Sequence, residues 1–171
     1  MSANSSFSAD SSPSPDSSPL IDLPDSPDSS TLPPRPPKHA AVLLPTDQEL
    51  VLKVIPMPGD CNANGDIFGG WVMAHVDLAG SVIPARCTQG RMATVAVNEF
   101  IFKQPVRVGD ILSFFSKLTR IGRTSITVKV EVYAERFRSQ GSYIKVTEAS
   151  LTYVAIDEAG QPREVPKPVD A

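Results

Sequence analysis

Asp66 is the residue of this chain best placed for chemistry, because of what surrounds it. It opens an apolar stretch, residues 66–87, that the sequence predicts to be a helix. The first N–H groups of a helix have no partner within it and can stabilise an oxyanion. Gly69 and Gly70 lack Cβ atoms, so a substrate could approach them closely. A carboxylate here could activate water or act as a nucleophile, or it could be an ordinary N-cap.

Two other groups with catalytic potential are less well placed relative to Asp66. Asp77 follows eleven residues later and would share its helix face. A rise of about 1.5 Å per residue separates the two carboxylates by about 16 Å, too far for an acid–base pair within one helix. We expect Asp77 to make an interhelical or backbone hydrogen bond at a contact between subunits. His75 would lie on the opposite side of the helix from Asp66.

The sequence contains no motif typical of a metal site or of a serine nucleophile. Its histidines, His39 and His75, and its cysteines, Cys61 and Cys87, are not spaced as C-x₂-C or H-E-x-x-H ligands. No serine stands in G-x-S-x-G. The chain shows neither a signal-peptide pattern nor an apolar run of about 18 residues. The sequence therefore predicts no metal, a cytoplasmic location and free thiols.

The elements that would position Asp66 are one strand, a helix and four further strands. β-branched residues fill the strands, and Gly or Pro residues separate most of them. Alternation is clearest in the fourth strand, where Ile126, Val128 and Val130 share one side. The predicted strands are 49–56, as an edge or first strand, then 94–102, 111–121, 124–137 and 143–157, and residues 57–65 are predicted to be a loop.

The predicted helix is apolar on almost all sides, and its glycines and Pro84 make it a weak helix former. Pro84 is expected to kink it or end it. Packing must stabilise such a helix, and short links between the later strands favour antiparallel pairing. These features predict an α+β hot-dog fold, in which a curled antiparallel sheet wraps around one long central helix. Since one sheet cannot cover the helix on every side, a second subunit is expected.

Residues 1–40 differ in composition from the rest of the 171-residue chain. The first 38 residues contain 12 Ser and 9 of the 17 Pro, and they account for the whole net charge of −3. So polar a segment predicts a disordered tail, with the folded domain at residues 41–171. The domain is neutral and lacks the positive field that nonspecific binding to nucleic acid or anionic membranes requires. We expect neither of these partners.

Three segments of the folded part carry longer motifs. They are NANGDIFGGW at 62–71, VAVNEFIFKQPVRVGD at 95–110 and RIGRTSITVKVEV at 120–132. In this order they resemble the YciA-type acyl-CoA thioesterases, which are hydrolases of the hot-dog fold. The resemblance implies that the chain releases a free carboxylic acid and coenzyme A from acyl-CoA by carboxylate-assisted attack of water. It also implies no cofactor, since coenzyme A is part of the substrate, and at least a homodimer, arranged as a trimer of dimers.

The resemblance further implies roles for individual residues. Asp66 would be the catalytic carboxylate, as a base or as a nucleophile, with Gly70 beside it. Main-chain contacts would hold pantetheine at 94–96. Backbone donors and the Arg123 cation at 122–125 would hold the nucleotide, although Arg123 could instead be a solvated turn cation. Asn98 would line the acyl channel or have a plain core role. The substrate-binding residues implied in this way are Asn64, Phe68, Gly69, Thr94, Val95, Ala96, Asn98, Gly122, Arg123, Thr124 and Ser125.

Two other functions stay open at this point. A hot-dog domain could bind acyl-CoA without hydrolysing it, as a sensor or accessory subunit. Such a protein has no need for a carboxylate beside a thioester, where desolvation costs free energy. Hydroxyacyl dehydratases of similar fold pair a histidine with a carboxylate, and neither His39 nor His75 is placed to pair with Asp66. Hydrolysis is therefore the predicted activity.

Overall fold

The computed structural model of this chain describes residues 42–166. The tail predicted at 1–40 lies outside the described residues, and so does the end of the domain predicted at 41–171. Five strands and one long helix make up the described part. In chain order the elements are β1 (Glu49–Val54), the 3-10 turn η2 (Pro58–Asp60), α1 (Gly69–Thr88), β2 (Met92–Phe102), β3 (Ile111–Ile121), β4 (Ser125–Glu135) and β5 (Tyr143–Ala155).

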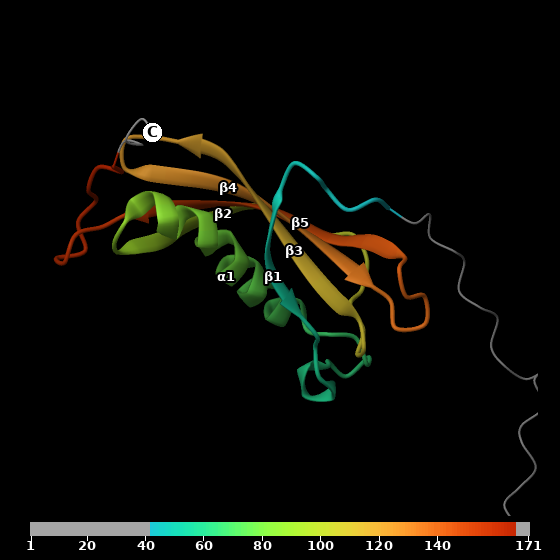
Figure 1. Cartoon of the computed structure of the whole chain (residues 1–171). Helices are drawn as coiled ribbons and strands as arrows, with labels where there is room; N and C mark the ends of the chain where they lie inside the picture. Colours follow the sequence, from blue (N-terminus) through green and yellow to red (C-terminus); the bar gives the residue numbers. More distant parts are fainter. Residues whose placement is uncertain (1–41, 167–171) are drawn as a thin grey trace, which may run out of the picture. The chain divides into compact units, whose positions relative to one another are not determined.

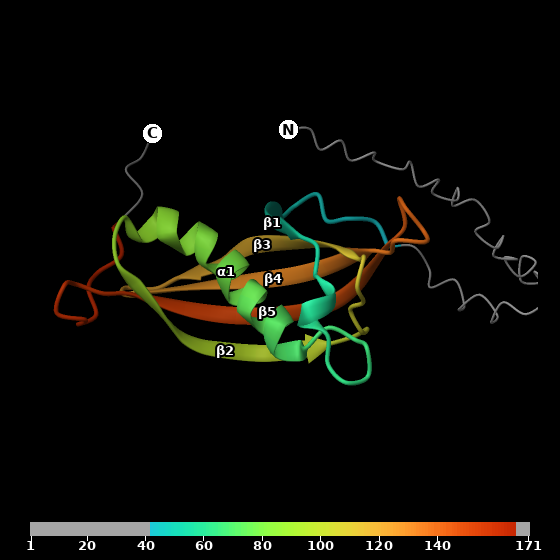
Figure 2. The same cartoon turned by 90° about the horizontal axis from the view of Figure 1, so that it is seen from below.

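The strands form one antiparallel sheet in the order β1-β3-β4-β5-β2. Short links explain why β3 pairs with β4 and β4 with β5, because a chain that reverses within a few residues pairs antiparallel. α1 lies across one face of this sheet (Figure 1; Figure 2). One long helix on an antiparallel sheet is the predicted hot-dog arrangement, and β1 is an edge strand as expected. The sheet does not close into a barrel, so β2 forms its other edge.

The core lies between α1 and the inner face of the sheet. Val72, Val76 and Ala79 of α1 are buried in one cluster with Val128 and Val130 of β4. Burial of a valine side chain contributes about 1.5–3 kcal/mol. Packing of this kind stabilises a helix whose own propensity is poor, as the sequence predicts.

Gly80 lets the middle of α1 approach β5 closely. A Cβ atom at this position would lie 2.6 Å from the hydroxyl oxygen of Tyr153. That hydroxyl donates to the main-chain oxygen of Asp77 over 2.9 Å. Close packing, rather than helix propensity, therefore accounts for a glycine in the middle of this helix.

α1 begins three residues later than predicted. Asp66 pairs with Arg107 in an isolated β-bridge, and the N–H of Ile67 donates to the carbonyl of Val106 over 2.9 Å. These contacts hold residues 66 and 67 extended, and the first helical residue is Gly69, after the N-cap Phe68. The prediction that Asp66 opens the helix is wrong, because pairing with a distant segment overrides the local helical pattern.

α1 also continues past Pro84 to Thr88. A proline inside a helix removes one backbone hydrogen bond. Pro84 and Thr88 are both buried, so packing against the sheet stabilises the last turn. The helix then ends at Gln89, which adopts a left-handed conformation with φ of 49°.

The side of α1 that faces away from the sheet keeps apolar residues. Met73 is 44% exposed and Leu78 is 60% exposed. Two valines of the edge strand β2, Val95 and Val97, are exposed as well. One sheet thus covers only one side of a helix that is apolar nearly all round. Within residues 42–166, no helix has the length and apolar character needed to cross a membrane.

Candidate functional site

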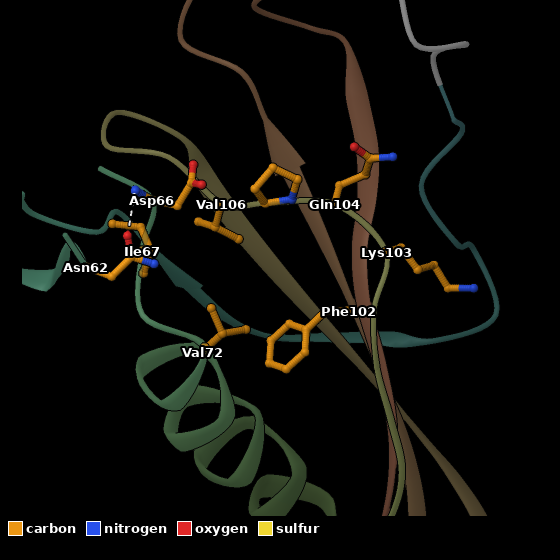
Figure 3. Close-up of a pocket in the computed structure, with 10 residues that line it drawn as sticks. Asn62, Asp66, Ile67, Val72, Phe102, Lys103, Gln104 and Val106 are labelled. Atoms are coloured by element: carbon orange, nitrogen blue, oxygen red, sulfur yellow. Dashed lines mark hydrogen bonds between the residues drawn. The ribbon is translucent and has the colours of Figure 1, made fainter. Parts of the chain in front are cut away.

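A cavity of about 320 Å³ lies where the start of α1 faces the segment that follows β2. In Figure 3, Val72 of α1 and Phe102 of β2 point toward each other, and Asp66 lies beside Val106. The lining residues are Asn62, Asp66, Ile67, Gly69, Val72, Phe102, Lys103, Gln104, Pro105 and Val106. The cavity therefore combines apolar walls with a carboxylate and amide groups.

Asn62 closes the loop that carries Asp66 into this cavity. Its side-chain oxygen accepts the N–H groups of Asn64 over 2.8 Å and of Asp66 over 3.3 Å. Its own N–H donates to the carbonyl of Asp66 over 2.7 Å. Gly65 completes the loop with φ of 81°, a conformation that favours glycine. The backbone of Asp66 is thus held on one side by Asn62 and on the other by Arg107.

The carboxylate of Asp66 is free to act on a bound molecule. It is half-buried, and it accepts no hydrogen bond from any residue between 42 and 166. Because the group is not the N-cap of α1, its role as an ordinary capping residue is excluded. A carboxylate in this condition can accept a proton from water or attack a carbonyl.

The first turn of α1 supplies unpaired donors close to Asp66. The carbonyl of Phe68 accepts the N–H groups of Trp71 over 3.0 Å and of Val72 over 3.3 Å. Among the described residues, the N–H groups of Gly69 and Gly70 have no acceptor. A Cβ atom on Gly70 would meet nothing within 4 Å, whereas one on Gly69 would lie 3.2 Å from the ring of Phe102. Two neighbouring donors of this kind, with open space beside Gly70, can stabilise an oxyanion.

Asp77 makes side-chain hydrogen bonds to β2 and β5 of its own chain, and its expected place at a contact between subunits stays a prediction. Its Oδ1 accepts the hydroxyl of Thr94 over 2.8 Å and that of Tyr153 over 3.1 Å. Burial, together with the Asp77 carboxylate, raises the pKa of the Tyr153 phenol above its usual range. Asp77 therefore ties the middle of α1 to β2 and β5, and the Thr94 hydroxyl is occupied by this contact.

The residues expected to hold the nucleotide lie at the other end of the sheet from Asp66. Ser125 pairs with Val154 of β5, whereas Phe102, at the cavity, pairs with Thr147 of the same strand. Seven residues of strand span about 23 Å. Within one chain, residues 122–125 and Asp66 are therefore not brought together.

The remaining predicted contacts are distributed between these two ends. Asn64, Phe68 and Gly70 are exposed next to the cavity without lining it, and only Asp66 and Gly69 of the predicted residues line it. Thr94, Val95 and Ala96 lie on β2 toward the nucleotide end, since Thr94 pairs with Tyr153. Asn98 pairs with Ser150 midway along the strand and is exposed, so it does not belong to the core of the single chain.

The sequence did not indicate several of the lining residues. Asn62 stands in the NANGD motif, and an asparagine two residues before another turn residue is a signal for the loop that it closes. Residues 103–106 gave no such signal, because their place opposite α1 depends on the pairing of Arg107 with Asp66. Tertiary pairing of this kind is not visible in local sequence.

His75 does not take part in the cavity. Its ring stacks on Trp71 with 3.8 Å between ring centroids, and its Nδ1 lies 2.8 Å from the carbonyl of Trp71. Among the described residues, no group of three or more His, Cys, Asp or Glu side chains could hold a metal ion. Cys61 and Cys87 are free thiols, as predicted.

Comparison with known proteins gives a consistent result. Residues 64–138 match the thioesterase superfamily. The acyl-CoA thioester hydrolase YciA of Salmonella typhimurium is 42% identical over 120 residues, which are 69% of this chain and 90% of that protein. The hexameric thioesterase y2039 of Yersinia pestis superposes with a TM-score of 0.68 at 44% identity, covering 72% of this chain and 99% of that one. HI0827, a hexameric broad-specificity acyl-coenzyme A thioesterase, gives 0.66 at 40% identity, covering 70% and 82%.

Proposed function

This chain belongs to the YciA acyl-CoA thioester hydrolases of the thioesterase superfamily, and we propose that it hydrolyses acyl-CoA at the cavity beside Asp66. The products are a free carboxylic acid and coenzyme A. The observation that carries the proposal is the meeting, at one cavity and its border, of a carboxylate and two N–H groups that have no partner between residues 42 and 166. These are the groups that attack on a thioester carbonyl needs.

In the proposed reaction the thioester carbonyl faces the first turn of α1. The N–H groups of Gly69 and Gly70 stabilise the negative charge that develops on the carbonyl oxygen. Asp66 accepts a proton from the attacking water, or attacks the carbonyl itself to give an anhydride that water then opens. Collapse of the intermediate breaks the carbon–sulfur bond and releases the thiolate of coenzyme A. Either route requires the carboxylate in its ionised form.

In this proposal, bound coenzyme A reaches from the cavity of one chain onto a second copy of the chain. Strand β2 has a strand partner on one side only among the described residues, and it exposes Val95 and Val97. If two copies pair antiparallel along this edge, the nucleotide end of one copy faces the Asp66 end of the other. Residues 122–125 of the second copy would then hold the nucleotide of a substrate bound at this cavity. The hexameric state of the structural neighbours supports a homodimer at least, as part of a trimer of dimers.

The other predicted substrate contacts fit the same arrangement. Asn64 and Phe68 would border the acyl-CoA where it enters, and residues 94–96 would line the pantetheine arm. Asn98 would face the acyl channel between them. No cofactor is needed for this chemistry, and a cytoplasmic location remains a prediction of the sequence.

Release of free thiol from acyl-CoA tests the proposed function. The full chain is mixed with butyryl-CoA or a longer acyl-CoA and a thiol-reactive dye, and the absorbance is followed. We expect continuous release of many equivalents of coenzyme A per chain. Binding of acyl-CoA without any thiol release would instead identify a sensor or accessory subunit.

A further inference from the structure

The segment that follows β2, residues 103–110, forms the cavity wall opposite α1 with residues 103–106, and the backbone of Asp66 is paired with it. Ile67 N–H donates to the carbonyl of Val106, and Asp66 pairs with Arg107. The position of the Asp66 backbone therefore depends on the position of residues 106 and 107. Contacts that fix residues 106 and 107 therefore also fix the backbone that carries the Asp66 carboxylate.

Asp110 closes the turn at the end of this segment. Its Oδ2 accepts the N–H of Arg107 over 2.9 Å, and its own N–H donates to the carbonyl of Arg107 over 3.1 Å. Gly109 allows the turn with φ of 84°. Asp110 is only 2% exposed, so its carboxylate acts from inside the protein.

Arg136, directly after β4, joins both ends of the turn. Its Nη1 donates to Oδ2 of Asp110, and its Nη2 donates to the carbonyl of Pro105 over 2.9 Å. The arginine side chain is itself 20% exposed. A planar guanidinium can make two such bonds in fixed directions, which an ammonium group cannot. Residues 105 and 110 are thereby held by one side chain from another strand.

We propose that Asp110 and Arg136 are positioning residues for Asp66, which act by fixing the 105–110 turn to which its backbone is paired. This inference rests on the proposed function. Neither side chain lines the cavity, so both would influence the rate through Asp66 and not through contact with the substrate. Burial raises the pKa of the Asp110 carboxyl, and the Arg107 N–H and the Arg136 guanidinium oppose that effect. Removal of the guanidinium would leave a buried carboxylate poorly compensated.

The test is a double-mutant cycle between Arg136 and Asp66 in the full chain. Arg136→Gln should lower kcat at least about tenfold and change KM less than about threefold, because binding energy is not made at this turn. In an Asp66→Ala background the same substitution should lower the residual rate less than about threefold, since there is no carboxylate left to position. Arg86→Gln removes an exposed guanidinium that pairs with Glu49, far along α1, and should leave kcat unchanged.

Equal losses in both backgrounds, or no loss from Arg136→Gln in the parent, would overturn the positioning role. Circular dichroism and thermal melting establish that each variant is folded at the assay temperature. If Arg136→Gln does not fold, Arg136→Lys takes its place, because it keeps the charge near Asp110 but not the paired bonds. An active parent with an unaffected variant overturns this inference alone, whereas a parent that hydrolyses no acyl-CoA overturns the proposed function as well.

Discussion

Asp66 owes its position to backbone contacts, and its side chain is left free for chemistry. Asn62 and Arg107 hold its main chain. The NGD-x-FGG motif within residues 62–71 predicts the carboxylate and the glycines of the proposed site from sequence. It does not suffice to place them, because a helix starting at Asp66 and one starting at Gly69 have the same local pattern. Only the bridge to Arg107 decides between them.

The two glycines Gly70 and Gly80 should differ in what an added methyl group costs. Gly70→Ala meets no atom within 4 Å, so the free energy of unfolding should change by less than about 0.5 kcal/mol. The methyl group would occupy the space through which a substrate reaches the first turn of α1, so kcat/KM should fall about tenfold or more. Denaturant unfolding and acyl-CoA assays measure the two effects separately.

Gly80→Ala should show the reverse pattern. The new Cβ would lie 2.6 Å from the Tyr153 hydroxyl, and Tyr153 is almost fully buried. Overpacking of this kind costs about 1–3 kcal/mol of stability. The cavity beside Asp66 is not touched, so the folded fraction should retain its kcat. A Gly80→Ala protein as stable as the parent would contradict the close approach of α1 and β5.

At the scale of elements, the strands were the most predictable part. The predicted range 111–121 coincides with β3, and the other strands differ by two residues or fewer at each end. Alternation of apolar and polar residues carries this information directly. The start of α1 was predicted less well, three residues early, because the pairing of residue 66 is a tertiary effect, whereas the predicted end at 87 lies one residue from Thr88.

The outer face of the sheet carries an ionic cluster that links β4 and β5. Glu131, 6% exposed, accepts hydrogen bonds from Tyr133 and Lys145 and pairs with Lys129. Burial alone would raise the pKa of this carboxyl, but the bonds to the two lysines and the tyrosine outweigh it and lower the pKa to about 2. A carboxyl with a lowered pKa stabilises the folded state at pH values above 4.5, its pKa in the unfolded chain. This contribution is lost as the pH falls toward 2.

Glu131→Gln should therefore flatten the acid side of the stability profile. We expect the parent to lose up to about 3 kcal/mol more than the variant between pH 5 and about pH 2. Urea unfolding of both proteins across this range measures the difference. Parallel curves for parent and variant would show that Glu131 titrates near its ordinary pKa. Asp47→Asn, at an exposed pair with Lys117, serves as the control and should change the slope little.

At the scale of the whole molecule, the proposed site needs more than one chain. Residues 122–125 lie about seven strand residues, or about 23 Å, from the cavity end of the sheet. Sequence motifs predict which residues would contact one substrate, but they do not predict which subunit would provide each residue. The apolar helix predicts a second subunit, but it does not predict where that subunit packs.

Val97→Lys tests the proposed contact along β2. Val97 is 46% exposed on the edge strand, and a lysine buried between two copies would cost several kcal/mol. We expect the mass measured by light scattering to fall toward that of the 18.3 kDa chain. KM for acyl-CoA should rise at the same time, because the second copy no longer holds the nucleotide. Leu50→Lys, on the opposite edge strand β1, should leave at least a dimer.

The most direct measurement for the whole proposal is the turnover of Asp66→Ala with acyl-CoA. The carboxylate accepts no hydrogen bond within residues 42–166, so the variant should melt near the parent temperature. With no group to activate water or to attack the carbonyl, kcat should fall about a hundredfold or more. A folded Asp66→Ala protein that keeps more than about a tenth of the parent kcat would show that another group performs the catalysis.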